Sequence, residues 1–500
     1  MQADLLDQAF TRAAGASRVA GNSVRVLKDA AENYPAWLAA IESAERCVLF
    51  ENYMFCEDES GRRFAAALAA KARAGVRVRV IYDWLGTRPR TSARFWRALR
   101  EAGVAIRVFN PPRLRGPFGW LHRDHRKMLA VDGRIGFVTG LCVGRMWEGD
   151  PARGLKPWRD TGVEVRGPAL HDIERAFAQV WADTGAVLPA EELTPPETIA
   201  PAGEVALRIV ASVPGILAVL RLDHLIAAAA RRSLWLTDAY FAGIPPYVQA
   251  LRSAALDGVD VRLLVPGASD VAILRPLSEA GYRPLLEAGV RVFEWKGSML
   301  HAKTAVADGR WARVGSSNLN IASWVGNYEL DAVIENEAIA TQMEQMYLDD
   351  LTQATEIVLR HRRRIVSALS QGMRRRMQRR RAWGETRGQS GSASRAAAGA
   401  LRLGRAVGAA LTDQRVLAPT EARLVAIVGM LALLIAAAAL LWPLLAAVPV
   451  CIVFAWMALA LFLKARALSR ERRRRGLPAT RIVHEHEREA YLKSPPPNAK

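Results

Sequence analysis

Two stretches of the sequence repeat one pattern of chemically active residues: a histidine, a lysine two positions later, and an aspartate five positions after the lysine. The six residues are His125, Lys127, Asp132, His301, Lys303 and Asp308. The chain contains only eight histidines, so two complete matches indicate a repeated site rather than chance. Imidazole groups can attack an electrophile or move protons, and ammonium groups neutralise anions. This combination suits a reaction at a phosphate ester.

Each motif predicts a hairpin of two apolar strands. Side chains alternate along a strand, so His125 and Lys127 are expected to project from the same face. Both motifs end in Asp-Gly, a strong hairpin signal, and an apolar strand is expected next at 135–138 and at 311–314. We therefore expect Asp132 and Asp308, although they belong to the motif, to anchor turns rather than to touch substrate.

A loop of small residues follows the second hairpin. Gly315, Ser316 and Asn318 can present hydroxyl, amide and backbone donors to an anion. Together with the motif they give the pattern H-x-K-x4-D-x6-G-S-x-N, which resembles the phospholipase D superfamily. In that family two copies, from one chain or from a dimer, meet at a single active site. The first copy departs from the family because its loop lacks the Gly-Ser pair and has Cys142 where asparagine is expected.

The resemblance implies a reaction in two steps without cofactor or metal. Two histidines facing one phosphorus permit one to form a phosphohistidine while the other protonates the leaving alkoxide. By analogy with the family, His125 is the nucleophile and His301 the acid and base. Lys127 and Lys303 would neutralise the charge on the phosphate oxygens, and Ser316 and Asn318 would support the substrate.

Each attacking or proton-donating imidazole needs a partner on its other nitrogen to fix its tautomer. Glu329 follows His301 at the place where the family has such a carboxylate. The matching residue for His125 is Asp160, which we prefer to Asp150 because the latter lies in a Gly/Asp/Pro loop. We therefore expect each carboxylate to serve the histidine of its own motif.

Longer segments narrow the resemblance to bacterial cardiolipin synthases. The matching segments are 120–127 with 132–135, Pro157-Trp158-Arg159-Asp160-Thr161 with 166–169, and 315–319. Those enzymes transfer a phosphatidyl group from one phospholipid to the hydroxyl of phosphatidylglycerol. The resemblance therefore implies an anionic phospholipid substrate.

The apolar and polar periodicity predicts an α/β protein in which strands alternate with helices twice over. We expect two phospholipase D-like α/β sandwich domains packed as a pseudo-dimer, followed by a C-terminal transmembrane helical hairpin. The predicted segments are an N-terminal stretch (1–23), domain 1 (24–200), domain 2 (201–361), a basic and Ser/Gly/Ala-rich linker (362–420), the hairpin (421–465) and a basic tail (466–500). Because both motifs lie in one chain, a dimer is not required.

Residues 424–463 are forty residues without a formal charge. As one helix they would extend about 60 Å, about twice the hydrocarbon thickness of a bilayer. Pro443 and Pro449 lie near the middle, which favours two spans joined by a turn, with a re-entrant hairpin or a buried helix pair as alternatives. Basic residues flank both ends, so the positive-inside rule places the ends and the catalytic region on the cytoplasmic side of the inner membrane.

The net charge of +20 is concentrated beside this apolar segment. Residues 362–381 contain nine arginines and no acid, and residues 464–475 carry a net charge of six. This distribution favours contact with anionic lipid over a nucleic-acid partner, with a solvated linker as the alternative. The four cysteines are scattered without paired spacing, which indicates neither a zinc site nor a disulfide framework.

We weigh three other functions against the phosphatidyltransferase. A phospholipase D would use water as the acceptor and release phosphatidic acid by the same chemistry. A nuclease or phosphodiesterase would act on nucleic acid, which the modest charge of residues 24–361 and the apolar hairpin disfavour. A membrane scaffold without activity would explain Cys142, but it leaves His125, Lys127 and Asp132 without a purpose.

Overall fold

The structure is a computed structural model that describes residues 2–112, 122–270, 274–358, 430 and 456. All elements discussed below lie in one compact unit made of residues 1–111 and 120–426. The predicted hairpin at 421–465, both basic runs and the linker fall almost wholly outside the described residues. No helix within the described part of the chain has the length and apolar character needed to cross a membrane.

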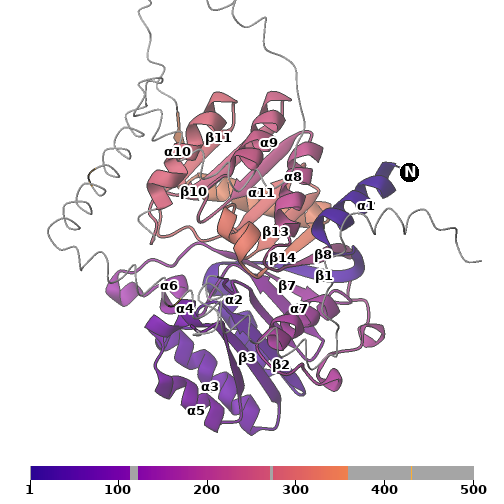
Figure 1. The fold of residues 1–500 in the computed structure, drawn as a ribbon, viewed down its shortest axis with the longest axis vertical. Coiled ribbons are helices and arrows are strands. Elements are labelled where there is room, and N and C mark those ends of the chain that lie inside the picture. The colour runs from indigo at the N-terminus through magenta and orange to yellow at the C-terminus, as the bar shows by residue number, and fades with distance from the viewer. Residues whose placement is uncertain (1, 113–121, 271–273, 359–429, 431–455, 457–500) are drawn as a thin grey trace, which may run out of the picture. The chain divides into compact units, whose positions relative to one another are not determined.

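The first half of this unit is a seven-stranded stretch of sheet with helices on both faces (Figure 1). Its strands, in spatial order, are β1 (Val19–Lys28), β7 (Thr161–Arg166), β6 (Ile135–Thr139), β5 (Lys127–Val131), β2 (Cys47–Asn52), β3 (Arg77–Asp83) and β4 (Ala105–Phe109). Its helices are α2 (Asp29–Glu42), α3 (Glu59–Arg73), α4 (Trp84–Thr87), α5 (Ala93–Glu101), α6 (Arg145–Glu148) and α7 (Leu170–Asp183). Parallel pairing of β2, β3 and β4 matches the predicted alternation of strands and helices.

The second half repeats this order. Its strands are β8 (Val205–Ser212), β14 (Glu329–Glu335), β13 (Trp311–Gly315), β12 (Thr304–Ala307), β9 (Ser233–Thr237), β10 (Asp260–Pro266), β11 (Arg291–Trp295) and the additional β15 (Ala354–Ile357). Its helices are α8 (Ala218–Ala229), α9 (Pro245–Leu256), α10 (Leu274–Glu287) and α11 (Glu337–Leu351). The mixed α/β architecture of two similar halves is confirmed.

The two halves share one continuous sheet of fifteen strands, because β1 of the first half pairs antiparallel with β8 of the second. The register of this junction shifts between Val19 and Asn22. Buried residues of α7 and α11 belong to one apolar cluster that includes strand residues from both halves. The halves are therefore joined by backbone pairing and by a common core.

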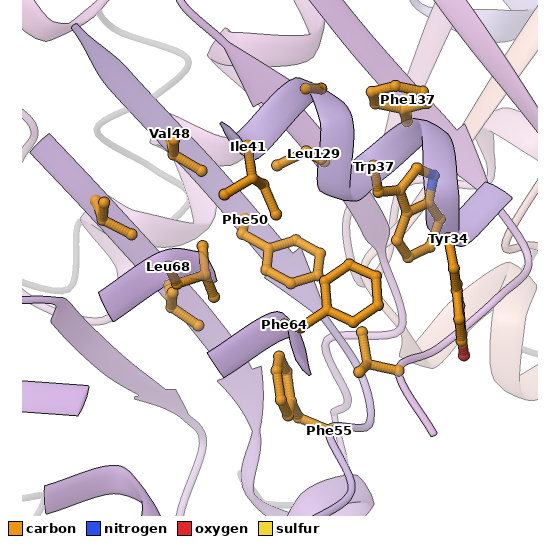
Figure 2. Close-up of a cluster of buried hydrophobic side chains, with 14 of the residues drawn as sticks. Tyr34, Trp37, Ile41, Val48, Phe50, Phe55, Phe64, Leu68, Leu129 and Phe137 are labelled. Carbon is orange, nitrogen blue, oxygen red and sulfur yellow. The ribbon is translucent and has the colours of Figure 1, made fainter. Parts of the chain in front are cut away.

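On the first half, α2 and α3 pack on one face of the sheet through the apolar cluster that Figure 2 shows, whereas α7 packs in the cluster on the other face. Helix α2 buries Tyr34, Trp37 and Ile41, a spacing of three and four residues that puts them on one helical face. Helix α3 buries Phe64 and Leu68 against them. Each such side chain stabilises the fold by about 1.5–3 kcal/mol. This packing fixes the strands that carry the first motif.

The N-terminal stretch packs on the second half of the chain. Helix α1 (Gln2–Ala14) lies beside α8 (Figure 1). Phe10 is buried in the core of the second half, and Asp7 forms an ion pair with Arg208 of β8. Strand β1 then begins at Val19, inside the segment 1–23 that the sequence analysis set apart. The first residues of the chain thus help to connect the two halves.

Candidate active site

Each motif histidine lies just before a buried strand that belongs to a hairpin. His125 precedes β5, and His301 precedes β12. At the far end of each hairpin, φ is +56° at Asp132 and +54° at Asp308, with positive φ at the following glycine in both cases. Two successive positive φ angles are those of a type I′ turn, which matches the right-handed twist of paired strands. The Asp-Gly signal therefore gave the correct local structure.

Asp132 and Asp308, assigned to the catalytic set as motif residues, lie at that turn and do not line the active-site cleft. The Asp132 carboxylate accepts hydrogen bonds from the backbone N–H groups of residues 45–47 at 2.7–2.8 Å. Asp308 accepts from the backbone N–H groups of residues 231–233. These bonds tie each turn to the start of β2 or β9. Both aspartates are structural anchors, as their position after apolar strands indicated.

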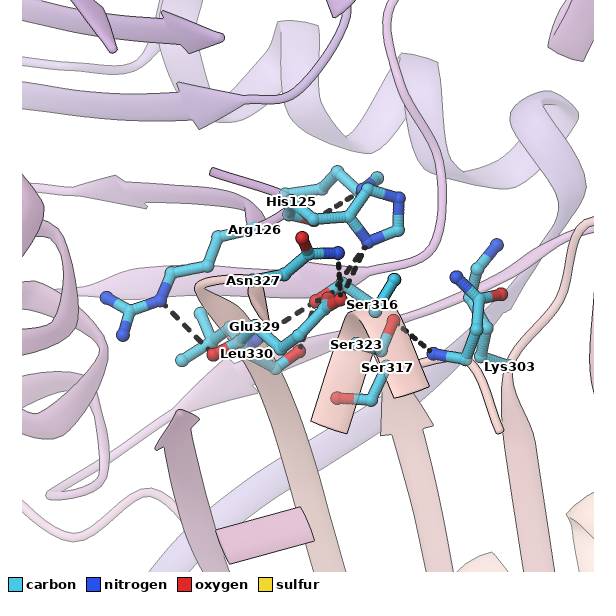
Figure 3. Close-up of polar contacts among 12 residues, drawn as sticks. His125, Arg126, Lys303, Ser316, Ser317, Ser323, Asn327, Glu329 and Leu330 are labelled. Atoms are coloured by element: carbon cyan, nitrogen blue, oxygen red, sulfur yellow. Dashed lines mark hydrogen bonds and ion pairs between the residues drawn. The ribbon is translucent and has the colours of Figure 1, made fainter. Parts of the chain in front are cut away.

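The supporting carboxylates are exchanged between the halves, so the predicted pairing was wrong. His125 Nδ1 lies 2.9 Å from Glu329 Oε2, and His301 Nδ1 lies 2.6 Å from Asp160 Oδ2. Figure 3 shows His125, Asn327 and Ser316 all directed at the Glu329 carboxylate. Each histidine is thus held by a residue from the other half of the chain.

Short backbone pairings explain the exchange. His125 N donates to Tyr328 O at 2.9 Å, and Tyr328 N donates to Arg123 O at 2.8 Å. In the same way His301 N donates to Arg159 O at 2.7 Å. The segment before each histidine therefore pairs with the segment that carries the other half's carboxylate. The sequence contains no marker for these isolated bridges, because they join residues about 140 and 200 positions apart.

The two motif lysines are fully buried beside the histidines. Lys127 Nζ donates to His125 O, and Lys303 Nζ donates to His301 O. Lys303 Nζ also lies 2.9 Å from Nδ1 and 3.2 Å from Nε2 of His301. Burial lowers the pKa of Lys303 to about 8. Lys127 lines the cleft and Lys303 contacts His301, so a phosphate anion bound beside them would compensate their charge.

Burial also keeps both imidazoles neutral at physiological pH. It lowers the pKa of His301 to about 3, with a further contribution from the charge of Lys303. Burial lowers the pKa of His125 as well, although Glu329 acts in the opposite direction. Burial alone would raise the pKa of the Glu329 carboxyl, but His125 and Lys127 lower it overall. A neutral ring whose Nδ1 faces an ionised carboxylate has Nε2 available as a base or nucleophile.

The two loops after the hairpins support their carboxylates differently. Ser316 Oγ donates to Glu329 Oε2 at 2.6 Å, so this hydroxyl holds the carboxylate. In the first half Gly140 stands at the corresponding place, and a Cβ there would lie 2.2 Å from Asp160 Oδ1. Trp147 Nε1 donates to Asp160 Oδ2 at 3.0 Å instead. Sequence reasoning missed Trp147, which lies outside every motif.

The cleft between the halves has a volume of about 480 Å³. Both histidines, Lys127, Cys142 and Asn318 line it, and Asn318 Oδ1 has no hydrogen-bond partner. The lining also includes part of a π-helical turn, Ala322–Gly326, a rare element often found at functional sites. Within the described part of the chain, no three His, Cys, Asp or Glu residues are grouped so as to hold a metal ion.

Two aromatic residues that the sequence analysis did not single out contact the histidines. The Tyr53 ring meets the His125 ring edge to face at 5.0 Å between centroids, and Tyr240 meets His301 at 5.8 Å. Both tyrosines line the cleft. Each tyrosine follows a strand that pairs with a motif strand, Tyr53 after β2 and Tyr240 after β9. The aromatic pattern shared by Tyr53-Met54-Phe55 and Tyr240-Phe241 was the signal from which their position could have been recognised.

Comparison with known proteins gives concordant results. Residues 37–144 and 222–351 match the family described as cardiolipin synthase, PLD-like domain. A cardiolipin synthase of Alkalihalophilus pseudofirmus is 32% identical over 67% of this chain and 67% of its own length. Cardiolipin synthase A of Pseudomonas fluorescens is 34% identical over 68% of this chain and 70% of its own length.

A solved structure has a similar fold. The phosphatidylserine synthase of Haemophilus influenzae covers 76% of this chain and 98% of its own, with a TM-score of 0.56 and 14% identity. At that identity the likeness concerns the fold alone. It extends over both halves of the described sheet.

Proposed function

Because the chain belongs to the cardiolipin synthase family with phospholipase D-like domains, we propose that it transfers a phosphatidyl group to the hydroxyl of phosphatidylglycerol. The observation that supports this reaction most directly is the pair of histidines in one cleft, each with a buried carboxylate on Nδ1. Two such groups can exchange one alcohol on phosphorus for another. The product would be a lipid with four acyl chains and two phosphates.

The first step would form a phosphohistidine. His125 Nε2 attacks phosphorus, the bond to the head-group oxygen breaks, and His301 donates a proton to that oxygen. In the resting site His301 is neutral, but an anionic phosphodiester bound beside it would raise its pKa and favour the protonated form. Glu329 stabilises the positive charge that develops on His125, and Lys127 and Lys303 stabilise the phosphate oxygens.

The second step is the reverse of the first, with the acceptor alcohol in place of the departed head group. His301 removes the proton from the acceptor hydroxyl, the new oxygen–phosphorus bond forms, and the bond to His125 Nε2 breaks. The assignment of His125 as nucleophile follows the family resemblance. Water in place of the alcohol would give phosphatidic acid by the same route.

Two exposed apolar side chains at the cleft support a lipid substrate. Leu85 of α4 is 43% exposed and Ile321 is 55% exposed, and both line the cleft, one from each half. Exposed apolar groups at a binding site suit acyl chains or a bilayer surface better than a polynucleotide. We further propose that the uncharged segment 424–463 anchors the protein in the inner membrane, with the catalytic unit on the cytoplasmic side.

The test is mass spectrometry of lipids after incubation of the purified full-length protein with phosphatidylglycerol vesicles. Appearance of the four-chain product, and its loss in His125→Ala and in His301→Ala, is the expected result. Phosphatidic acid as the sole product would indicate a hydrolase. Product formation that survives both substitutions would exclude this site as its origin.

A further inference from the structure

The two walls of the active-site cleft carry opposite charges. On the wall of the first half, Arg90 and Arg123 line the cleft near Tyr53. Among the described residues that line the cleft, Asp270 on the wall of the second half is the sole carboxylate. In an in-line displacement the attacking imidazole and the alcohol oxygen lie on opposite sides of the phosphorus, so the two walls can contact different parts of the substrate.

Asp270 is linked to the active site through Tyr240. The phenol OH of Tyr240 donates to Asp270 Oδ1 at 2.8 Å, while its ring contacts His301. The backbone on both sides is fixed: Tyr240 N donates to Asp238 Oδ2 at 3.1 Å, and Asn320 Nδ2 donates to Tyr240 O at 3.0 Å. Burial and the charge of Asp270 raise the pKa of Tyr240, so the phenol remains a donor. Asp270 is thereby placed about one tyrosine side chain from His301.

The exposed carboxylate retains unused acceptor capacity. Within the described residues, no cation pairs with Asp270, and its printed hydrogen bond occupies one of two oxygens. A carboxylate can accept about four hydrogen bonds in total. An alcohol whose reacting oxygen lies at His301 would therefore present any further hydroxyl groups toward a strong acceptor.

We infer that Asp270 determines which alcohols the enzyme exchanges, by accepting hydrogen bonds from the free hydroxyl groups of a polyol such as glycerol. This inference rests on the proposed phosphatidyl transfer and on His301 as the group that protonates the leaving alcohol. The phosphatidyl group passes from His125 Nε2 to the alcohol oxygen, and the alcohol proton passes to His301. Asp270 takes no part in bond making. It selects which alcohol is bound beside His301 when the phosphatidyl group is transferred.

The experiment uses the full-length protein with phosphatidylglycerol as the donor lipid, which carries deuterated acyl chains and an unlabelled glycerol head group. Isotope-labelled glycerol and ethanol are present at equal concentration as competing acceptors. Mass spectrometry then gives the ratio of labelled phosphatidylglycerol to phosphatidylethanol. A second assay follows release of nitrophenolate from phosphatidyl-p-nitrophenol, whose leaving group carries no free hydroxyl. Asp270→Asn should lower the glycerol-to-ethanol ratio about tenfold or more and reduce transfer to glycerol far more than nitrophenolate release. Tyr240→Phe should lower the ratio as well.

A matched control is available outside the cleft. Tyr328 OH donates to Asp183 Oδ2 at 3.0 Å, an exposed tyrosine–aspartate pair of the same kind. Asp183→Asn should leave the glycerol-to-ethanol ratio unchanged. An unchanged ratio in Asp270→Asn, or an equal loss of both alcohols and of nitrophenolate release, would overturn the inference. Failure of the wild-type protein to transfer to any alcohol, with nitrophenolate still released, would instead contradict the proposed transferase function.

Discussion

Replacing Glu329 by glutamine should specifically impair His125, the nucleophile of the proposed reaction. Glu329 is fully buried, ionised and 2.9 Å from His125 Nδ1. The glutamine side chain has a similar size but lacks the charge, and its amide group can turn an N–H toward the ring. The neutral side chain would then neither hold the reactive tautomer of His125 nor stabilise the charge that develops when Nε2 bonds to phosphorus.

The distance gives the magnitude. Two unit charges 2.9 Å apart interact by about 6 kcal/mol at an effective dielectric constant of about 20. Because an amide dipole replaces part of this interaction, we expect a loss of about 3–5 kcal/mol in transition-state stabilisation. This corresponds to a decrease of about 10²–10⁴ in kcat. In a serine protease, replacing the carboxylate beside the catalytic histidine by an amide lowers kcat by a factor of about 10⁴.

The assay compares Glu329→Gln with Asp160→Asn on two substrates. Phosphatidyl-p-nitrophenol releases a phenolate that needs no proton, so the first burst of nitrophenolate reports the nucleophile alone. Glu329→Gln should slow this burst by the same factor of about 10²–10⁴ by which it slows turnover of phosphatidylglycerol. Asp160→Asn weakens the support of His301, so it should slow phosphatidylglycerol turnover but spare much of the burst.

The opposite pattern, with the burst lost in Asp160→Asn and retained in Glu329→Gln, would refute this reasoning. The contact between each histidine and its carboxylate can be tested without catalysis, by measuring the stability of single and double variants in thermal unfolding. His125→Gln and Glu329→Gln should be coupled by about 1 kcal/mol or more, whereas His301→Gln and Glu329→Gln should be additive within about 0.5 kcal/mol. Coupling of Glu329 to His301 instead would contradict the crossed arrangement itself.

Three further predictions concern stability and reactivity. Asp132→Ala removes three hydrogen bonds to backbone N–H groups, so it should lower the free energy of unfolding by about 2–4 kcal/mol. The kcat of the folded protein should be retained. A large fall in kcat without destabilisation would return Asp132 to the catalytic set. Because the folded-state pKa of His301 is about 3 against an ordinary 6.5, the unfolded state binds more protons between these values. Stability should therefore fall as the pH is lowered from about 6.5, by up to about 1.4 kcal/mol per pH unit for this group, and denaturant titrations of His301→Gln should show a smaller slope. Burial raises the pKa of Cys47 and of Cys56 to about 12 and also raises that of Cys142; peptide mapping should thus find these three thiols unmodified by iodoacetamide at pH 8 until the protein is unfolded.

Local signals predicted local structure well. Asp132-Gly133 and Asp308-Gly309 form the expected turns. The strands expected at 135–138 and 311–314 are β6, Ile135–Thr139, and β13, Trp311–Gly315. These features depend on side chains a few positions apart. Their physical cause is present within one short window of sequence.

Long-range pairing was not predictable from such windows. Asp160 and Glu329 were found as carboxylates, but their partners were assigned within each half, whereas tertiary contact assigns them across the halves. Strand β7, Thr161–Arg166, was not recognised because Gly162 and Glu164 interrupt its apolar pattern. Gly140 leaves room for the Asp160 carboxylate, to which Trp147 donates, and only the three-dimensional structure shows this arrangement.

The crossed carboxylates have a consequence for synthesis of the chain. His125 leaves the ribosome about 200 residues before Glu329, the group that fixes its tautomer. A nascent first half therefore has a complete H-x-K-x4-D motif but lacks the carboxylate that orients His125. Reactivity toward phosphodiesters would arise only when the strand bearing Glu329 docks. The growing polypeptide is thus inert toward lipids until nearly the whole catalytic unit has been made.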